Sequence, residues 1–155
     1  MKASIWRTFA AFVALGGVSL AQSADKKDDF EREKLIGAWR LVSMEEPGAD
    51  GKLHRIIDRK GMLLYTRDGH MSVQVRYPKS ESDISNDYVK DGYEASFGSY
   101  DVNEEAHTVT HHVQGSITPG LVGNDLTRVY QFSGARLIIK SARADEHWSV
   151  TWEHY

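Results

Sequence analysis

The chain has 155 residues, contains no cysteine and carries a formal net charge of −3 at pH 7. This mildly acidic composition argues against nucleic acid as the main partner, because binding to phosphate requires clustered lysine and arginine. Without cysteine the chain forms no disulfide and carries no lipid-modified cysteine, so its fold must rest on a hydrophobic core.

Residues 1–21 have the features of a secretory signal peptide. The positive charges of Lys2 and Arg7 precede an apolar run of about a dozen residues, after which small side chains follow. This order predicts cleavage after Ala21 or Ser23. The run is short for a transmembrane span, which needs roughly 18 or more apolar residues, although an uncleaved anchor is the alternative. We therefore expect an exported protein, periplasmic or secreted, with no stable membrane anchor after cleavage.

The rest of the chain predicts one domain. Residues 22–34 form a charged linker with a short helix, capped by Asp28 or Asp29 and ending at Gly37. Residues 35–155 form the domain itself, and a chain of this size has enough residues for one core but not for two.

Short alternating runs separated by turn residues dominate this domain, and helical periodicity is nearly absent. Many short antiparallel strands in one small domain predict a sandwich or a closed barrel. A polar interruption at residues 78–93 is expected to hold a helical turn at residues 87–90. We expect strands at residues 38–45, 52–57, 61–67, 70–77, 95–102, 107–117, 126–133, 136–141 and 147–154.

Asp68 and Gly69 predict a two-residue hairpin turn. Pairing outward from this turn divides the flanking side chains into two faces, of which the more uniformly apolar one is assigned to the core. The predicted core face holds Met62, Leu64, Thr66, Met71, Val73 and Val75, and the predicted outer face holds Leu63, Tyr65, Arg67, His70, Ser72, Gln74 and Arg76.

Two further hairpins can be aligned in the same way. The segment FSGARLI predicts a tight turn, and the loop at residues 103–106 predicts a longer one. The first hairpin would direct Arg128, Tyr130, Phe132, Leu137, Ile139 and Ser141 inward. The second would pair Val102 with His107, Tyr100 with Val109, Gly98 with His111 and Ser96 with Val113.

The segment HTVTHHVQGS carries three histidines close together. On a strand, His107 and His111 lie about 13 Å apart, at roughly 3.3 Å per residue. A zinc–nitrogen bond is only about 2.0–2.1 Å long, so these two residues cannot share one ion. His112 points to the opposite face. We therefore predict no metal from this cluster and no cofactor, while a site that joins His111 to distant strands is the alternative.

Only His111 keeps an inward role, opposite Gly98, whose missing side chain would leave space. It is either a core histidine bonded to a neighbour, with a bulge at Gly98, or a polar group in a cavity. In a cavity it could hydrogen-bond a ligand or act as a base.

Arg128 is the second inward polar group, and it must be paired or reach water. It could bind a ligand carboxylate, lie at the mouth of a barrel, or pair with Asp125 or Glu153. Aromatic side chains at strand spacing form either core or cavity wall. They are Trp39, Tyr100, Tyr130, Phe132, Trp148 and Trp152.

Four segments of the domain together carry a family resemblance. LIGAWRLVSMEE places Gly37-x-Trp39 at the start of the first strand, and GMLLYTRDGHMSVQV, FGSYDVNEEAHTVTHHVQGSITPGLVGND and LTRVYQFSGARLII follow. Over residues 35–154 the chain resembles the bacterial and fungal lipocalin-like domain family, within the wider calycin-type barrel superfamily. The resemblance implies a small antiparallel up-and-down β-barrel of about 8–10 strands, a tryptophan that plugs its closed end, and an internal cavity for small apolar molecules. The disulfide of better-known lipocalins is missing.

We therefore expect an exported barrel that binds a small, mostly apolar molecule, which can carry a carboxylate. The alternatives are a cofactor-free isomerase or cyclase with His111 as acid or base, a haem-binding barrel with His111 as axial ligand, and a structural envelope protein. Nucleophilic catalysis has no support, because no Gly-x-Ser-x-Gly motif is present. The expected ligand-binding residues are His111, Arg128, Tyr100, Tyr130, Trp152 and Gly98.

Overall fold

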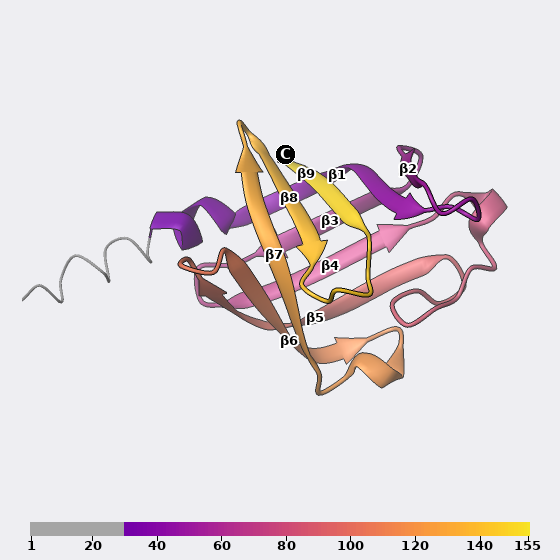
Figure 1. The fold of residues 1–155 in the computed structure, drawn as a ribbon. Coiled ribbons are helices and arrows are strands. Elements are labelled where there is room, and N and C mark those ends of the chain that lie inside the picture. The colour runs from indigo at the N-terminus through magenta and orange to yellow at the C-terminus, as the bar shows by residue number, and fades with distance from the viewer. Residues whose placement is uncertain (1–29) are drawn as a thin grey trace, which may run out of the picture.

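The computed structural model describes residues 30–155, which form a closed antiparallel β-barrel preceded by one short helix (Figure 1). A ninth strand, β2 (Leu53–Ile56), pairs only with the far end of β1. The predicted all-β barrel is confirmed, and every predicted strand overlaps an observed one. The barrel strands are β1 (Gly37–Pro47), β3 (Lys60–Tyr65), β4 (His70–Arg76), β5 (Tyr93–Asn103), β6 (Thr108–Ser116), β7 (Asp125–Ser133), β8 (Arg136–Ser141) and β9 (Ser149–His154).

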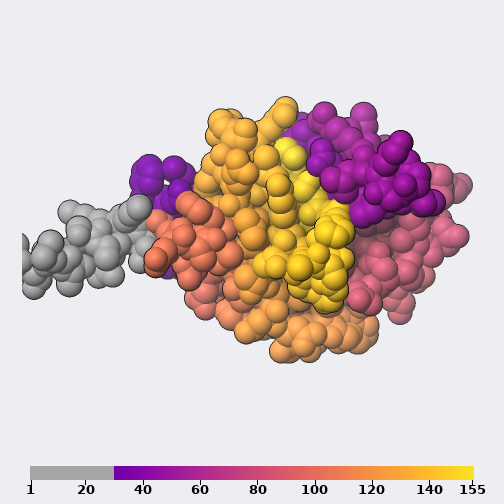
Figure 2. All heavy atoms as spheres, in the orientation of Figure 1, coloured from indigo at the N-terminus to yellow at the C-terminus, as the bar shows by residue number. Residues whose placement is uncertain are grey.

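Closure of the barrel depends on the pairing of β1 with β9, from Trp39 opposite His154 to Glu45 opposite Ser149. The space-filling view shows the purple and yellow segments from the two ends of the described chain packed side by side (Figure 2). A register shift between Leu41 and Ser43 bends β1, as bulges do. This bend lets one long strand pair with β3 near its start and with β2 near its end.

Residues 30–35 are helical and lie at one end of the barrel. The expected leader, the first part of the linker and the predicted cap at Asp28 or Asp29 lie outside the described residues. Glu104, in the turn after β5, accepts hydrogen bonds from the backbone N–H groups of Glu31 and Arg32 at 2.6 and 3.3 Å. These bonds hold the helix against the turn. Among residues 30–155, no helix is long and apolar enough to cross a membrane.

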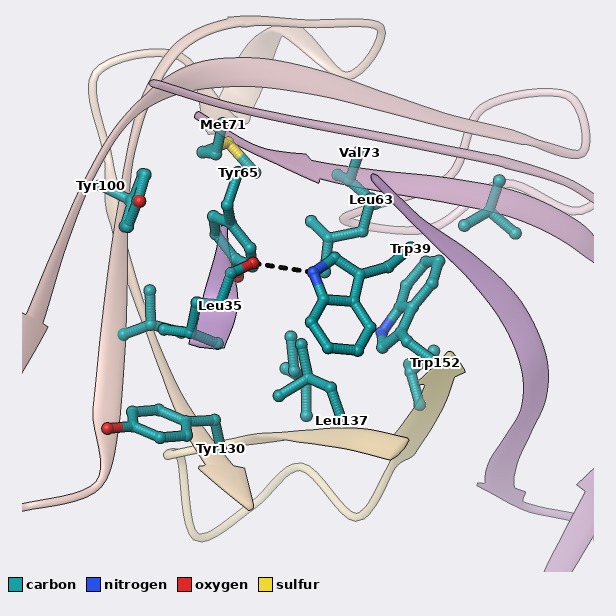
Figure 3. Close-up of a cluster of buried hydrophobic side chains, with 14 of the residues drawn as sticks. Leu35, Trp39, Leu63, Tyr65, Met71, Val73, Tyr100, Tyr130, Leu137 and Trp152 are labelled. Carbon is teal, nitrogen blue, oxygen red and sulfur yellow. Dashed lines mark hydrogen bonds between the residues drawn. The ribbon is translucent and has the colours of Figure 1, made fainter. Parts of the chain in front are cut away.

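The end of the barrel beside this helix is densely packed (Figure 3). Trp39 is 2% exposed, and its Nε1 donates a hydrogen bond of 2.8 Å to the carbonyl of Leu35. A buried indole N–H needs such a partner. Trp39 therefore fills this end, as the resemblance implied. The residues packed around it include Leu35, Tyr65, Tyr100, Val109, Tyr130 and Leu137.

The first hairpin differs from its prediction. Leu63 pairs with Val73, and Tyr65 pairs with Met71. Leu63 and Tyr65 are both 1% exposed, so the assignment of Met62, Leu64 and Thr66 to the core is wrong. The loop has three residues, because Thr66 pairs with His70 through a backbone bond of 2.8 Å. Gly69 adopts φ +87° there, a conformation that glycine reaches without steric cost.

The second hairpin is confirmed, with Tyr130 opposite Ile139 and Phe132 opposite Leu137. In the third, the partners of Val102, Tyr100 and Gly98 are displaced by two residues, and the bulge after Phe97 displaces the partner of Ser96 by three. The strand residues keep their predicted faces, but His107, predicted opposite Val102, lies in the turn. Its loop spans residues 104–107, so Tyr100 pairs with His111.

The polar interruption also differs from its prediction. A 3-10 turn, η1 (Lys79–Glu81), replaces the expected helical turn at residues 87–90. At that position Asn86 Oδ1 instead accepts the backbone N–H groups of Tyr88 and Val89. A second 3-10 turn, η2 (Pro119–Leu121), lies between β6 and β7.

Candidate ligand-binding cavity

The half of the barrel away from the helix encloses a cavity of about 320 Å³. Small-molecule sites in proteins commonly occupy about 300–1,000 Å³ and are lined mostly by apolar groups. The side chains packed around Trp39 lie outside this cavity, so the barrel is solid at one end and hollow at the other. Apolar and aromatic side chains form most of the wall, among them Leu63, Val73, Val75, Ile139, Val150 and Trp152.

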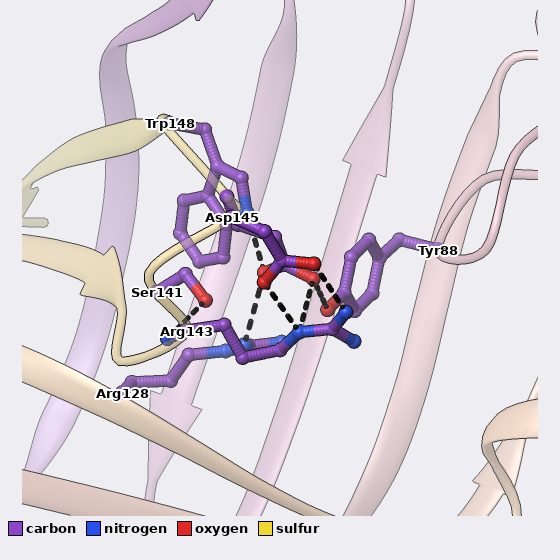
Figure 4. A network of polar contacts seen from close by, with 7 residues as sticks. Tyr88, Arg128, Ser141, Arg143, Asp145 and Trp148 are labelled. Atoms are coloured by element: carbon purple, nitrogen blue, oxygen red, sulfur yellow. Dashed lines mark hydrogen bonds and ion pairs between the residues drawn. The ribbon is translucent and has the colours of Figure 1, made fainter.

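Arg128, on the inner face of β7, is the first polar group of the cavity (Figure 4). Its guanidinium lies 4.9 Å from the ring centre of Trp148 and 5.1 Å from that of Tyr88. Its Nη1 is 4.0 Å from Glu146 Oε2, which is its only ion pair within the described residues. This separation is longer than a direct hydrogen bond. The cation is therefore balanced by an acid nearby and by two aromatic faces.

Glu146 lies in the loop between β8 and β9, and it is held in place by its neighbours. It accepts a hydrogen bond of 2.8 Å from the hydroxyl of Tyr88 and one of 3.1 Å from the indole N–H of Trp148. Burial alone would raise the pKa of Glu146, but these bonds, one from Ser141 and the charge of Arg128 hold that pKa below its ordinary value. Glu146 is therefore an anion that shares a network with Arg128.

The acids expected to pair with Arg128 have other partners. Asp125 lies 2.6 Å from Nδ1 of His112 on the outside of the barrel, and Glu153 forms an ion pair with Arg40. Both suggested pairings are therefore wrong. Glu146 follows β8 in a loop, so no strand alternation in the sequence could place it beside β7.

His111 lies on the inner face of β6 and is 7% exposed. Its Nε2 shares a hydrogen bond of 2.7 Å with the hydroxyl of Tyr65. Burial and the charge of Arg128 lower the pKa of His111 to about 3, so the imidazole is neutral at neutral pH. The residue is thus a core histidine bonded to a neighbour, and it also lines the cavity.

Gly98 does not leave space beside His111, because it pairs with Val113 at a bulge between Phe97 and Gly98. A Cβ atom at Gly98 would lie 1.9 Å from the carbonyl oxygen of His112. The glycine is therefore required by the close approach of two backbones. The expectation of a gap opposite His111 is wrong, and the bulge given as the alternative is the observed feature.

Three of the six expected ligand-binding residues line the cavity, namely His111, Arg128 and Trp152. Tyr100 and Tyr130 belong to the packed end. Their hydroxyls donate hydrogen bonds to the carbonyl of Thr66 and to a carboxylate oxygen of Glu31, at 2.9 and 2.8 Å.

Two charged groups near the cavity were not anticipated. Glu94 lies on the inner face of β5, two residues before Ser96, and both line the cavity. Desolvation raises the pKa of Glu94 to about 7, despite the opposing charge of Arg128. The predicted strand began at residue 95, so Glu94 was left out. Glu94 lies two residues before Ser96, so continuing the alternation of inward residues on β5 toward its start predicts an inward Glu94.

Arg59, between β2 and β3, is the second unanticipated group, and it is 4% exposed. Its Nη1 donates a hydrogen bond of 2.6 Å to Glu46, and its Nε donates one of 3.1 Å to Glu81. The guanidinium lies 3.7 Å from the ring centre of Tyr77. Arg59 thus ties β1 and η1 together beside the cavity. Its position in a short connection gave no signal in the sequence.

The three neighbouring histidines point in different directions. His107 lies in the β5–β6 turn at φ +51°, His111 points inward, and His112 bonds to Asp101 and Asp125 outside. Among residues 30–155, no three His, Cys, Asp or Glu side chains converge in a geometry that could hold a metal ion.

Several solved structures are similar to the chain. The solved structures that it resembles include a lipocalin-like protein from Bacteroides uniformis, at 14% identity and TM-score 0.48, covering 79% of this chain and 99% of that one. An uncharacterized protein from Bacteroides eggerthii matches at 13% and 0.46, with 78% and 99% coverage. A mutant of the fluorescent protein UnaG matches at 11% and 0.42, with 79% and 97% coverage.

No curated protein matches the chain. The model of the lipocalin-like domain family, however, matches residues 36–154. This match spans every strand of the barrel, from β1 to β9. The chain belongs to the lipocalin-like domain family.

Proposed function

We propose that the protein is an exported barrel that binds a small, mostly apolar molecule in its cavity. The observation that carries the proposal is the contrast between the two halves of the barrel. One half is filled by side chains, whereas the other encloses about 320 Å³ behind apolar and aromatic walls. A largely apolar pocket with a few polar groups is the usual form of a small-molecule site.

A carboxylate on the ligand, bound by Arg128, is the second part of the proposal. Because Glu146 lies 4.0 Å from Arg128, no direct hydrogen bond joins them, and the guanidinium, which has five N–H donors, could still donate to an anion in the cavity. Binding is favoured over catalysis by His111, because a base whose conjugate acid has a pKa of about 3 is poorly matched to proton transfer near pH 7. Use of His111 Nε2 as a haem ligand would break its bond to Tyr65.

A pair of fluorescent probes with the same apolar body tests both parts. N-phenyl-1-naphthylamine is neutral, and 8-anilino-1-naphthalenesulfonate adds one anionic group to that body. We expect both probes to bind. Arg128→Gln should weaken the sulfonate about tenfold through loss of a charge-assisted hydrogen bond, and should leave the neutral probe unchanged. An equal loss for both probes would contradict an anion site at Arg128.

A cavity-filling variant shows whether the probes enter the barrel. Val150 lies on the inner face of β9 and lines the cavity, whereas Val129 lies on the outer face of β7 and is 37% exposed. Val150→Phe should abolish binding of N-phenyl-1-naphthylamine, and Val129→Phe should not. If wild-type protein binds neither probe, or if both variants bind equally, the cavity is not the binding site. Independently of the probes, mass spectrometry of organic extracts from the purified protein would identify a natural ligand that co-purifies with it.

Export is tested separately, by N-terminal sequencing of protein recovered from the periplasm and the medium of an expressing bacterium. We expect chains that begin at Gln22 or Ala24, after cleavage at Ala21 or Ser23. Leu15→Arg interrupts the apolar run and should keep the full-length chain inside the cell. Wild-type chains that keep Met1 in the cytoplasm would contradict export.

A further inference from the structure

Glu94 is a carboxylate in the cavity without a counter-ion. Its partner across the sheet is Val75 on β4, which also lines the cavity, and the next inward residue on β5 is Ser96. Within residues 30–155, the Glu94 carboxylate has no hydrogen bond and no ion pair within 4.0 Å. A charged group beside apolar walls is costly unless it is paired. A positive charge in the cavity would therefore stabilise the ionised carboxylate of Glu94.

The nearby cations form their ion pairs with acids other than Glu94. Arg59 is shared between Glu46 and Glu81, at 2.6 and 3.1 Å. Arg128 has Glu146 at 4.0 Å and the faces of two aromatic rings. The charged groups that shift the pKa of Glu94 are Arg128 from β7, Glu46 from β1 and Arg59 from the β2–β3 connection. Glu46 is paired with Arg59, but its charge still opposes ionisation of Glu94, so a positive charge beside Glu94 would favour the ionised carboxylate.

We propose that Glu94 binds a basic nitrogen, such as a protonated amine, carried by an otherwise apolar ligand. This inference rests on the proposed function, since it concerns the ligand of the same cavity. A cation at this position would supply the charge that no described side chain provides. The cavity is also lined by three aromatic side chains, Tyr77, Tyr88 and Trp148. Aromatic faces attract cations. A charge-assisted hydrogen bond to the carboxylate would fix the orientation of the ligand.

Three indoles with the same apolar body test the proposal. Tryptamine is cationic, tryptophol is neutral and indole-3-propionate is anionic at pH 8. Isothermal titration calorimetry would compare the wild-type protein with Glu94→Gln. The matched control is Glu105→Gln, which removes an exposed carboxylate in the turn at the packed end. We expect wild-type protein to bind tryptamine about tenfold more tightly than tryptophol, because of the additional charge-assisted hydrogen bond.

Glu94→Gln should abolish this preference for tryptamine, and Glu105→Gln should preserve it. Affinity for tryptamine should also fall as the pH is lowered below about 7, because the pKa of Glu94 lies there and the protonated carboxyl no longer attracts a cation. Glu94→Gln should remove this dependence, which separates Glu94 from Glu46, Arg59 and Arg128. His111, with a pKa of about 3, stays neutral throughout this range.

Several outcomes would overturn the proposal. These are equal binding of tryptamine and tryptophol, tighter binding of indole-3-propionate alone, and a preference for tryptamine that survives in Glu94→Gln. If no indole binds but N-phenyl-1-naphthylamine does, the cavity binds apolar molecules and the amine site is wrong. If neither the indoles nor that probe bind, the proposed function itself fails. Thermal melting of each variant confirms that it is folded.

Discussion

The hydroxyl of Tyr65 lies 2.7 Å from Nε2 of His111, and the bond joins β3 to β6 across the inside of the barrel. Tyr65 belongs to the packed end and is 1% exposed, whereas His111 lines the cavity. The pair therefore marks the boundary between the solid half of the barrel and the hollow half. Burial raises the pKa of Tyr65 and lowers that of His111, so both groups are neutral at the floor of the cavity.

Removing the hydroxyl should destabilise the barrel. Tyr65→Phe leaves the imidazole nitrogen of His111 buried without a partner, and such a loss costs about 1–3 kcal/mol. Urea denaturation would measure the change in the free energy of unfolding. Tyr93→Phe is the matched control, because Tyr93 is 49% exposed, and it should stay within about 0.5 kcal/mol of wild type. Equal stability of Tyr65→Phe and wild type would show that this bond contributes little.

Glu94 should make stability fall as the pH rises. Its pKa is raised to about 7 in the folded chain from an ordinary value of 4.5. The folded state therefore holds the proton more tightly, and this contribution is complete below pH 4.5 and lost as the pH passes 7. Relative to wild type, Glu94→Gln should gain on the order of 3 kcal/mol between pH 4 and pH 8.5. Denaturation at both pH values measures this gain, with Glu105→Gln as the control that should show none.

His112 should show a pH dependence of its own on the outer surface. Hydrogen bonds to Asp125 and Asp101, at 2.6 and 2.9 Å, raise its pKa above the ordinary value of 6.5. The stabilisation is therefore complete below pH 6.5 and is lost as the pH rises through the elevated pKa. The melting temperature of His112→Gln should fall further below wild type at pH 5.5 than at pH 9. His147→Gln, at an exposed position, should show no such difference.

Gly98 should tolerate no side chain. Its Cβ would lie 1.9 Å from the carbonyl oxygen of His112, so Gly98→Ala must push two paired strands apart. Overpacking of this kind costs about 1–3 kcal/mol or more. Gly120→Ala is the control, because a methyl group added there would meet no other atom within 4 Å. Urea midpoints would compare the two variants, and an equal effect would show that the bulge can relax.

The sequence predicted which segments form strands better than it predicted how those strands pair. Alternating residues located all nine strands, and in the eight strands of the barrel this alternation reflects one buried face. The ninth strand, β2, has no buried residue. Pairing depends on loop length, which the turn residues did not define. Asp68 and Gly69 indicated a two-residue turn, but the loop also includes Arg67. Because the loop has one residue more than predicted, Leu63 faces the core where Leu64 was expected.

Prediction of the site followed the same pattern. Arg128 was correctly directed inward because its hairpin was correctly aligned, and His111 was correctly directed inward because its error was an even number of residues. Glu146 and Arg59 lie in connections, where no periodicity assigns a direction to a side chain. Glu94 could have been found, since it continues the alternation of Ser96 and Tyr100.

The pairing of β1 with β9 also has a kinetic consequence. Ser149 Oγ donates a hydrogen bond to Glu45, 104 residues earlier in the sequence. Contacts of such long range require the closure of a long loop, which costs chain entropy. They therefore make folding slower. The barrel cannot close until residues 149–154 have been synthesised, so β1 lacks its β9 partner until the end of synthesis. A chain that ended before β9 would leave the edges of β1 and β8 open to association with other chains.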